Sequence, residues 1–268
     1  MTVIPSVNLQ RVISAIAGAL VIIIAAWYGG IPLLILLGII IAFGLKEINA
    51  ILYEMGLRPS VFLTYAGGLI LLAGAYFCLE GYPGPAMLII LFLHLFAIIF
   101  LFPRYNINDM AGTLTGTLYV GLLSYLYMIR SLEEGWIWLI LLLACTWAND
   151  TCAFLVGRAF GNKPLAPKIS PNKTVEGSLG GILGSVVVAG AITLFYPALP
   201  LFKIMLLGLL LSIVAIFGDL LESALKRQAG IKDSGALIPG HGGILDRFDS
   251  TIFTAPLVYY YVVIFILS

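Results

Sequence analysis

Long uncharged apolar stretches, separated by short polar loops, dominate the chain. Five of them are long enough for a membrane-spanning helix, at residues 59–79, 81–103, 110–129, 177–202 and 250–268. Such a helix needs about 20 mostly apolar residues. Two further runs, 135–149 and 204–218, reach this length only when they include Asp150 and Asp219. The pattern therefore predicts helices that cross a membrane.

The first apolar run, residues 12–45, is too long for one helix. Its "YGGIP" segment at 28–32 contains two glycines and a proline, which predict a break into two shorter helices. The total is about nine spans, with a re-entrant arm in the first pair as the alternative. A hydrophobic fraction of 61% with only 10% charged residues excludes an ordinary soluble domain. We predict an all-α, polytopic transmembrane bundle.

The distribution of lysine and arginine predicts the orientation of the bundle. With nine spans, one set of loops holds 12 of the 14 basic residues, and the other holds only Arg130 and Lys203. Cytoplasmic loops carry the excess of Lys and Arg in membrane proteins. We therefore expect the N-terminus and the longest polar loops to be cytoplasmic.

Several polar or small residues within spans are interpreted as packing features. His94 lies mid-span, where hydrogen bonding to a neighbouring helix is the favoured interpretation over a proton site or ligand. The three cysteines also fall within spans and are interpreted as small buried residues, which argues against disulfides. Small residues recur every four positions in "GSLGGILGS", 177–185, a spacing that permits close helix contact.

The polar residues divide the chain into two parts. Residues 1–135 have short loops and are expected to form a transmembrane scaffold, while 136–268 carry two polar loops and are expected to be catalytic. Spans ending in Asp150 and Asp219 precede these loops. An aspartate at the centre of a membrane helix costs roughly 2.5–3.5 kcal/mol, and less near its ends. A cation, a basic partner or a proton must offset that cost.

The second polar loop ends in "KRQAGIKDSGALIPGHGGILDRFD", residues 226–249, which holds seven charged residues and five glycines. Asp246 and Asp249 lie three residues apart and share a face of any helix that begins there. With Asp219 as a third acid, they predict a Mg²⁺ site, because Mg²⁺ takes carboxylates together with phosphates and water. The alternative is a pair of acids that cap the helix.

Basic residues and glycines supply the other half of this loop. The bases that bracket "PGHGG" are Lys226, Arg227, Lys232 and Arg247. The glycines, among them Gly242 and Gly243, let backbone N–H groups approach an anion closely. Carboxylates, bases and backbone donors together suit a polyphosphate bridged by a divalent metal. The alternative is a solvated loop that orients the protein and contacts anionic lipid.

The first polar loop, "GRAFGNKPLAPKISPNKTVEGS" at 157–178, repeats the basic character. Ser170 and Pro171 are expected to begin a helix, whose start beside Lys168 and Lys173 would seat an anion. Asn149 and Asp150 enter this loop from the membrane side. An ordinary positive-inside loop is the alternative.

Together these segments resemble the phosphatidate cytidylyltransferases, the CDP-diacylglycerol synthases. "SALKRQAGIKDSGALIPGHGGILDRFD", residues 223–249, looks like the full motif of that family, and the segment from Asn149 to Gly181 resembles its other polar region. The likeness spans the chain but is specific only in the last 120 residues or so. Some relatives carry another residue pair at Asn149–Asp150.

The resemblance implies a reaction and a set of roles. A phosphate oxygen of phosphatidate attacks the α-phosphorus of CTP in line, which gives CDP-diacylglycerol and pyrophosphate. Mg²⁺ would be held by Asp219, Asp246 and Asp249, with a second cation left open. The other catalytic residues would be Lys226, Arg227 and Arg247. Substrate binding would fall to Asn149, Asp150, Lys168, Lys173, Ser223, Lys232, His241, Gly242 and Gly243.

The same resemblance implies a homodimer in the bacterial inner membrane, with the site on the cytoplasmic side and no nucleic-acid partner. Two alternatives remain at this point. One is a CTP-dependent lipid kinase of the polyprenol or phytol type, which transfers the γ-phosphate. The other is a cation or phosphate transporter, although transporters tend to place polar groups near the bilayer midplane.

Overall fold

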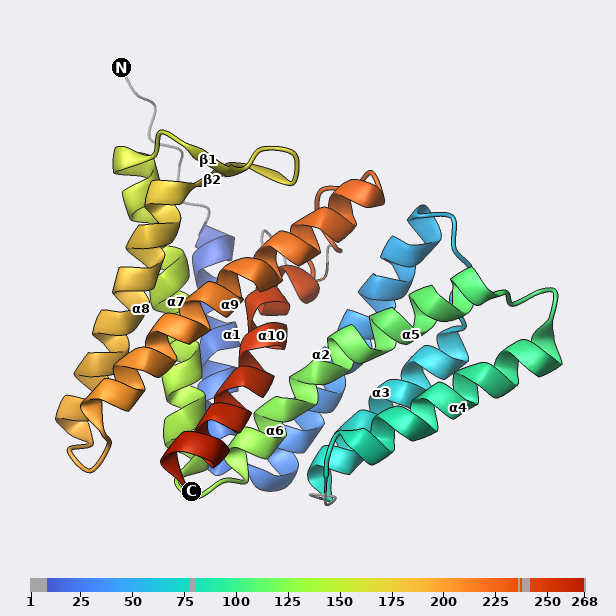
Figure 1. The fold of residues 1–268 in the computed structure, drawn as a ribbon, viewed down its shortest axis with the longest axis horizontal. Coiled ribbons are helices and arrows are strands. Elements are labelled where there is room, and N and C mark those ends of the chain that lie inside the picture. The colour runs from blue at the N-terminus through green and yellow to red at the C-terminus, as the bar shows by residue number, and fades with distance from the viewer. Residues whose placement is uncertain (1–8, 78–80, 236, 238–241, 268) are drawn as a thin grey trace.

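A bundle of helices with one small β-hairpin forms the computed structural model, which describes residues 9–77, 81–235, 237 and 242–267, with side chains from Ala17 onward (Figure 1). The first five helices and the short turn after them are α1 (Leu9–Tyr28), α2 (Gly30–Glu54), α3 (Val61–Tyr76), α4 (Gly84–Leu101), α5 (Ile107–Gly121) and the 3₁₀ turn η1 (Leu122–Ser124). The remaining elements are α6 (Tyr125–Arg130), α7 (Gly135–Phe160), β1 (Pro164–Ala166), β2 (Ser170–Thr174), α8 (Val175–Phe195), α9 (Leu201–Gln228), α10 (Leu245–Tyr261) and the π-helical η2 (Val262–Ile266).

The described helices confirm an all-α membrane protein. Seven of those described are long and apolar enough to cross a membrane, namely α2, α4, the α5–α6 unit, α7, α8, α9 and the α10–η2 unit. Two shorter apolar helices are Ala17–Tyr28, within α1, and Val61–Tyr76. The count of nine spans and the orientation stay predictions.

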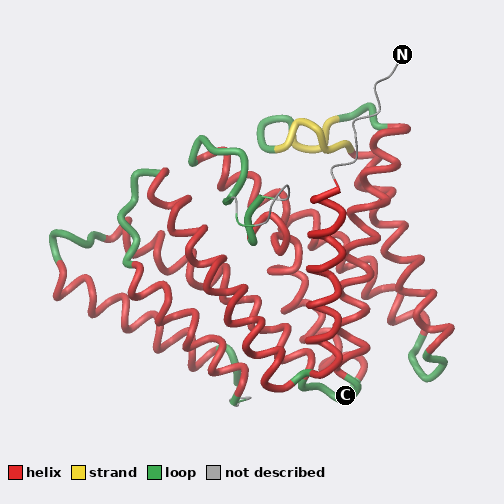
Figure 2. Tube along the Cα trace, turned by 180° about the vertical axis from the view of Figure 1, so that it is seen from behind, coloured by secondary structure: helices red, strands yellow, loops and turns green. Residues whose placement is uncertain are grey.

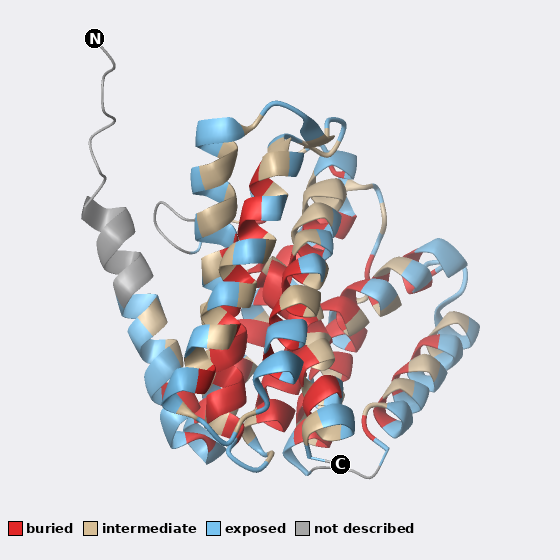
Figure 3. Ribbon diagram, turned by 60° about the vertical axis from the view of Figure 1, so that its left-hand side comes forward, coloured by how far each residue is buried: buried red, intermediate tan, exposed pale blue. Residues whose placement is uncertain are grey.

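Helix α8 shows how one surface faces lipid while the other packs (Figure 3). Leu179, Leu183 and Val187 recur every four residues and are each more than half exposed. Gly181 and Ser185 are buried on the opposite face. Because apolar side chains on an outer face need a nonpolar solvent, this arrangement fits a helix at the lipid boundary.

The predicted break in the first apolar run is confirmed. Gly29 separates α1 from α2, and both Gly29 and Gly30, the first residue of α2, have positive φ, at 64° and 50°. That conformation is readily adopted only by glycine. The Arg130 guanidinium caps the end of α1, donating from Nε to the Ala26 carbonyl at 2.7 Å and from Nη2 to that of Trp27 at 3.0 Å. These bonds satisfy carbonyls that the helix end leaves open.

Close contact between α7 and α8 confirms the interpretation of the small residues. A Cβ atom added at Gly181 would lie 2.6 Å from Asn149 Oδ1 and 2.8 Å from the Asn149 carbonyl oxygen. Only glycine lets the two helices meet at that distance. The Asn149 side chain also ties α7 to α9, because its Oδ1 accepts a 2.5 Å hydrogen bond from Ser212 Oγ.

The expectation of a helix beginning at Ser170 and Pro171 is wrong. Residues 170–174 instead form β2, which pairs antiparallel with β1 in the register Pro164 with Thr174 and Ala166 with Ser170. The helix begins at Val175, where Thr174 is the N-cap and its Oγ1 accepts from the Gly177 N–H at 3.1 Å. Because residues 170–174 pair with β1, the helix starts later, and the Thr174 hydroxyl caps it in place of Ser170.

His94 and the described cysteines are packed residues, with one correction. His94 is buried, and its Nδ1 lies 2.8 Å from the carbonyl oxygen of Ile90 in its own helix, whereas a neighbouring helix was expected. Cys145 is buried and Cys152 half-buried, and both are free thiols. Cys78 lies outside the described residues.

The antiparallel course of α7 to α10 gathers the polar segments at one end of the bundle. The end of α7, the hairpin, the start of α8, the end of α9 and the start of α10 meet there, while the loop between α8 and α9 lies at the opposite end (Figures 1 and 2). Helix α1 contacts both α2 and α7. The division into a scaffold and a catalytic region at residue 135 stays a prediction.

Candidate active site

Two cavities lie side by side at this polar end and share a wall. The first has a volume of about 700 Å³ and the second about 610 Å³, and Asp150 of α7 and Asp219 of α9 line both. A reaction between two bound molecules needs such an arrangement, with a separate site for each reactant and reactive groups where the sites meet.

The first cavity, called the acidic cavity below, has an excess of negative charge. Six carboxylates and two basic side chains line it: Asp150, Asp219, Glu222, Asp233, Asp246 and Asp249 with Lys226 and Arg247. The remaining lining forms an apolar wall of Gly18, Ala19, Ile22, Leu143, Trp147 and Phe248, with Thr251 beside it. Uncompensated carboxylates inside a protein are costly, so this cavity favours cations.

The second cavity, called the polar cavity below, is closer to electrical balance. Against the two shared aspartates it carries Arg158 of α7 and Lys173 of β2, and Lys173 forms an ion pair with Asp219. Five neutral polar residues also line it, namely Asn149, Ser170, Asn172, Thr174 and Ser178, beside the apolar or glycine positions Ala153, Phe154, Gly157, Gly177, Ala215 and Ile216. Basic groups with many neutral hydrogen-bonding groups suit an extended anion that also has sugar or base atoms.

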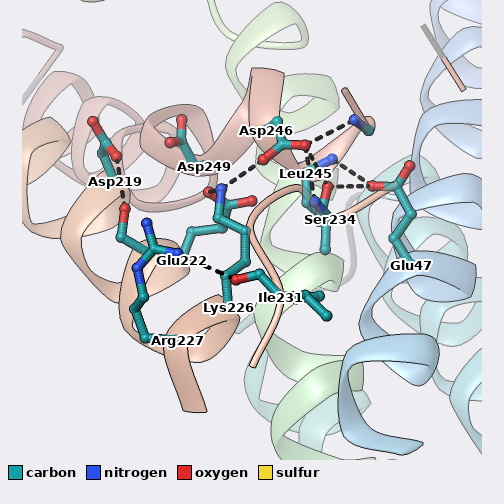
Figure 4. Close-up of polar contacts among 12 residues, drawn as sticks. Glu47, Asp219, Glu222, Lys226, Arg227, Ile231, Ser234, Leu245, Asp246 and Asp249 are labelled. Atoms are coloured by element: carbon teal, nitrogen blue, oxygen red, sulfur yellow. Dashed lines mark hydrogen bonds and ion pairs between the residues drawn. The ribbon is translucent and has the colours of Figure 1, made fainter. Parts of the chain in front are cut away.

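Backbone contact between α9 and α10 brings Asp219 and Asp249 together. A Cβ added at Gly218 would lie 2.7 Å from the Asp249 carbonyl oxygen. Ser250 Oγ donates to the Ala215 carbonyl at 3.2 Å, which fixes the same contact. As a result the Asp219 and Asp249 carboxylates lie near each other on one side of the site (Figure 4).

Asp246 differs from these two acids, because its carboxylate is fully engaged (Figure 4). Its Oδ1 accepts from Lys226 Nζ at 2.6 Å, and its Oδ2 accepts from the Gly243 N–H at 2.8 Å and from the Ser234 N–H at 3.0 Å, with Ser234 Oγ also 3.0 Å away. Lys226 Nζ also pairs with Glu222 Oε2 at 2.6 Å. The Lys226 ammonium is therefore held between two carboxylates of the protein.

The other acids keep more of their capacity to accept. Asp219 Oδ1 accepts a 3.4 Å hydrogen bond from Ser223 Oγ, and Asp249 Oδ1 accepts from the Ser250 N–H at 2.6 Å. Asp150 Oδ1 accepts from Asn149 Nδ2 at 3.3 Å. Glu222 Oε1 is buried with no hydrogen-bond partner in the structure. A buried carboxylate oxygen without a hydrogen-bond donor is costly, so this oxygen favours a bound cation or donor.

These acids fit Mg²⁺ only in part. Among the side chains that the structure describes, no group of three or more His, Cys, Asp or Glu residues is arranged to hold a metal ion. Mg²⁺ usually takes only one or two protein carboxylates and completes its octahedron with water and substrate phosphates. Asp249 fits such a site, and so does Asp219 if its ion pair with Lys173 opens, whereas both Asp246 oxygens are held by Lys226, Ser234 and Gly243.

The cavities bring together about half of the residues singled out from the sequence. Those that line one cavity or both are Asn149, Asp150, Lys173, Asp219, Lys226, Asp246, Arg247 and Asp249. Ser223 reaches the site through Asp219. The Gly243 N–H was expected to bind a substrate anion but donates to the Asp246 carboxylate. Gly242, with φ at 82°, makes the turn before it.

Three predicted residues lie elsewhere, and one is outside the described part of the chain. Lys168 is exposed in the hairpin turn and Lys232 is exposed after α9; neither is among the described residues lining the two cavities. Arg227 is exposed and donates from Nε to the Ile169 carbonyl and from Nη1 to that of Ile231, both at 3.3 Å, so it joins α9 to the hairpin. His241 lies outside the described residues.

Several residues of the site were missed from the sequence. Glu222 lies three residues after Asp219 and four before Lys226, a helical spacing that could have revealed it. Glu47 carried only a weak signal, because it stands beside Lys46 at the end of the first apolar run and looks like a loop residue. The apolar wall contributed by α1 carried none, because Gly18, Ala19 and Ile22 look like any other span.

The fold and the site together define a polytopic membrane protein with joined cavities whose carboxylates and bases suit phosphorylated substrates. The chain belongs to the Cytidylyltransferase family, whose model matches residues 9–265. It is 37% identical over 293 residues to a phosphatidate cytidylyltransferase of Synechocystis sp., covering 95% of this chain and 96% of the relative. Proteins of the same name from Staphylococcus aureus strain COL and Staphylococcus epidermidis strain RP62A are 35% and 33% identical, each covering 92% of this chain and 96% of the relative.

Proposed function

We propose that this chain is a CTP:phosphatidate cytidylyltransferase that makes CDP-diacylglycerol and pyrophosphate. The observation that carries the proposal is the pair of cavities that meet at Asp150 and Asp219, which both have charged and apolar lining but differ in their balance of acids and bases. The names of the family relatives fit a nucleotide and a lipid as the two occupants.

The polar cavity is the site for CTP. Arg158 and Lys173 offset the charge of a triphosphate, and the hydroxyl and amide groups around them match ribose and base atoms. Since Lys173 already pairs with Asp219, bound phosphate takes over part of that ion pair. The α-phosphorus then lies toward the shared wall.

The acidic cavity is the site for phosphatidate. Its apolar wall accepts the start of the acyl chains, and Arg247 offsets the charge of the lipid phosphate. Six carboxylates would repel that phosphate on their own, so the cavity needs a compensating cation.

Mg²⁺ would be held by Asp219 and Asp249, and when bound it lowers the repulsion between the two phosphates and supports charge on the leaving pyrophosphate. A second cation stays an open prediction. The residues of the chain orient the reactants and offset charge. No general base is needed, because the attacking phosphate oxygen is already anionic.

The placement in the cell is also part of the proposal. The bias of Lys and Arg toward one set of loops supports nine spans with the site on the cytoplasmic side of a bacterial inner membrane. Single cysteines are introduced at position 168 or 203 of a variant that lacks the three native cysteines, and intact cells are treated with a membrane-impermeant thiol reagent. Only the cysteine at position 203 should react, because it should lie outside the cell. We also propose a homodimer, which cross-linking in native membranes tests.

Labelled CTP tests the proposed reaction directly. Purified protein in mixed micelles with Mg²⁺ and either phosphatidate or a polyprenol is given CTP labelled at either the α- or the γ-phosphate. We expect the α-label to enter the lipid fraction and the γ-label to leave as pyrophosphate. Entry of the γ-label into lipid would identify a lipid kinase instead, and no transfer of either label would refute both functions.

A further inference from the structure

The part of the chain expected to be scaffold sends one carboxylate into the active-site region. Glu47, on α2, is only 7% exposed. Its Oε1 accepts from the Ile244 N–H at 2.8 Å, and its Oε2 accepts from the Leu245 N–H and from Ser234 Oγ, both at 2.9 Å (Figure 4). These donors lie nearly 200 residues away in the sequence.

Glu47 is the N-terminal cap of α10. The residue that precedes that helix, Ile244, offers no side-chain cap of its own. The first N–H groups of a helix need acceptors, and a negative charge is favoured at that end. Because Asp246 and Asp249 stand in the first turns of α10, the acceptor that fixes the start of the helix also fixes their positions.

Ser234 extends the contact from Glu47 to Asp246. Its Oγ lies 2.9 Å from Glu47 Oε2 and 3.0 Å from Asp246 Oδ2, and its N–H donates to the same Asp246 oxygen. Lys226 then links Asp246 to Glu222. Asp246, Lys226 and Glu222 all line the acidic cavity, so the connection runs from α2 to the cavity surface.

The surrounding loop is shaped closely around this carboxylate. A Cβ added at Gly235 would lie 2.7 Å from Glu47 Oε1, and one at Gly243 would also overlap the Glu47 carboxylate. Burying an acid in this way is a poor means of gaining stability, because an apolar side chain of similar size often serves as well. The geometry therefore indicates that the acid serves to place α10.

We propose that Glu47 is a positioning residue for the reaction, acting through Ser234 and the N-terminus of α10 to hold Asp246 and Asp249 at the acidic cavity. The inference rests on the proposed function, since it assigns a role in that reaction. Glu47 itself does not line the acidic cavity among the described residues, and it acts through the groups that do.

The test compares Glu47→Gln, Ser234→Ala and the double variant with a matched control. Asp109 is a second buried carboxylate that caps a helix, accepting from the Arg58 N–H at 2.7 Å and the Asn106 N–H at 3.2 Å, but it caps α5. Asp109→Asn thus removes a buried helix-capping charge from a carboxylate that does not contact the active site. Each protein is purified in detergent, its folded fraction is measured, and kcat and KM are determined for both substrates.

We expect Glu47→Gln to lower kcat by roughly 10- to 100-fold, the range for small displacements that arise away from the reacting atoms. KM for CTP should stay within about twofold, because the polar cavity is untouched. The double variant should be no slower than the slower single variant, since both act through one contact. Asp109→Asn should keep wild-type kcat per folded molecule.

A kcat within twofold of wild type for Glu47→Gln would overturn the inference. An equal loss in Asp109→Asn, or losses that multiply in the double variant, would overturn it as well. Hydrogen exchange gives a readout independent of turnover, with faster exchange expected at the Ile244 and Leu245 amides in Glu47→Gln only. If wild-type protein transferred no label, the proposed function would fail, while unchanged exchange at those amides would separately refute the role of Glu47.

Discussion

Replacing Asp246 or Asp219 with asparagine tests the proposal that Asp219 holds Mg²⁺ and Asp246 does not. In Asp246→Asn, the new amide would keep one oxygen, which can still accept from Ser234 and Gly243, but its NH₂ group would face the Lys226 ammonium. One charged hydrogen bond, worth roughly 1.5–3 kcal/mol, is lost. Breaking a buried ion pair completely costs about 3–5 kcal/mol. Since Lys226 keeps Glu222 at 2.6 Å, we expect a loss of about 2–3 kcal/mol.

A loss of that size leaves a protein of ordinary stability folded, so both variants can be assayed. Transfer of the α-label into lipid is measured against Mg²⁺ concentration. Asp219→Asn should raise the half-saturating Mg²⁺ concentration by roughly tenfold or more. Asp246→Asn should lower kcat and the unfolding temperature but leave that concentration nearly unchanged. Equal shifts in the two variants would show that Asp246 holds the metal, contrary to the contacts described here.

Three further predictions address the cavities and their walls. Lys173→Gln should raise KM for CTP roughly tenfold with kcat less affected, because one charged contact is lost. Trp147→Ala should raise KM for phosphatidate by up to about tenfold and leave that for CTP unchanged, since the apolar wall loses an aromatic surface. Gly181→Ala should destabilise the bundle by about 1–3 kcal/mol through overpacking against Asn149; Gly190→Ala, with its nearest contact at 3.5 Å, is the control in thermal unfolding.

The helices could be predicted from the sequence because the membrane imposes a simple rule. An apolar run must form a helix if it is to satisfy its backbone groups in lipid. The break at Gly29–Gly30 and the close α7–α8 contact at Gly181 could also be predicted, because glycine allows both a positive φ and a close approach of two helices. The acids Asp150 and Asp219 stood out because charge is rare at membrane depth, and Asp249 because it lies three residues after Asp246.

The failures concern contacts between segments that are distant in the sequence. Ser170 and Thr174 are both good N-cap residues, and only pairing with β1 decides that Thr174 caps α8. Asp246 as a metal ligand stays a prediction, but it was made from the spacing to Asp249, without the partners that the fold brings to Asp246. Its partner, Lys226, comes from α9, and Glu47 comes from α2. Spacing along one helix cannot reveal either contact.

The imbalance of the acidic cavity is best explained by the reaction. Topology requires bases on one side of the membrane but no carboxylates, and stability is served better by apolar residues than by buried acids. Six carboxylates facing two basic groups create a negative field that attracts cations and repels lipid phosphate. If phosphatidate binds in this cavity, as proposed above, a cation must bind with it to offset this repulsion. Under that proposal the metal would be a condition for lipid binding, and removing the divalent cation should abolish phosphatidate binding as well as turnover.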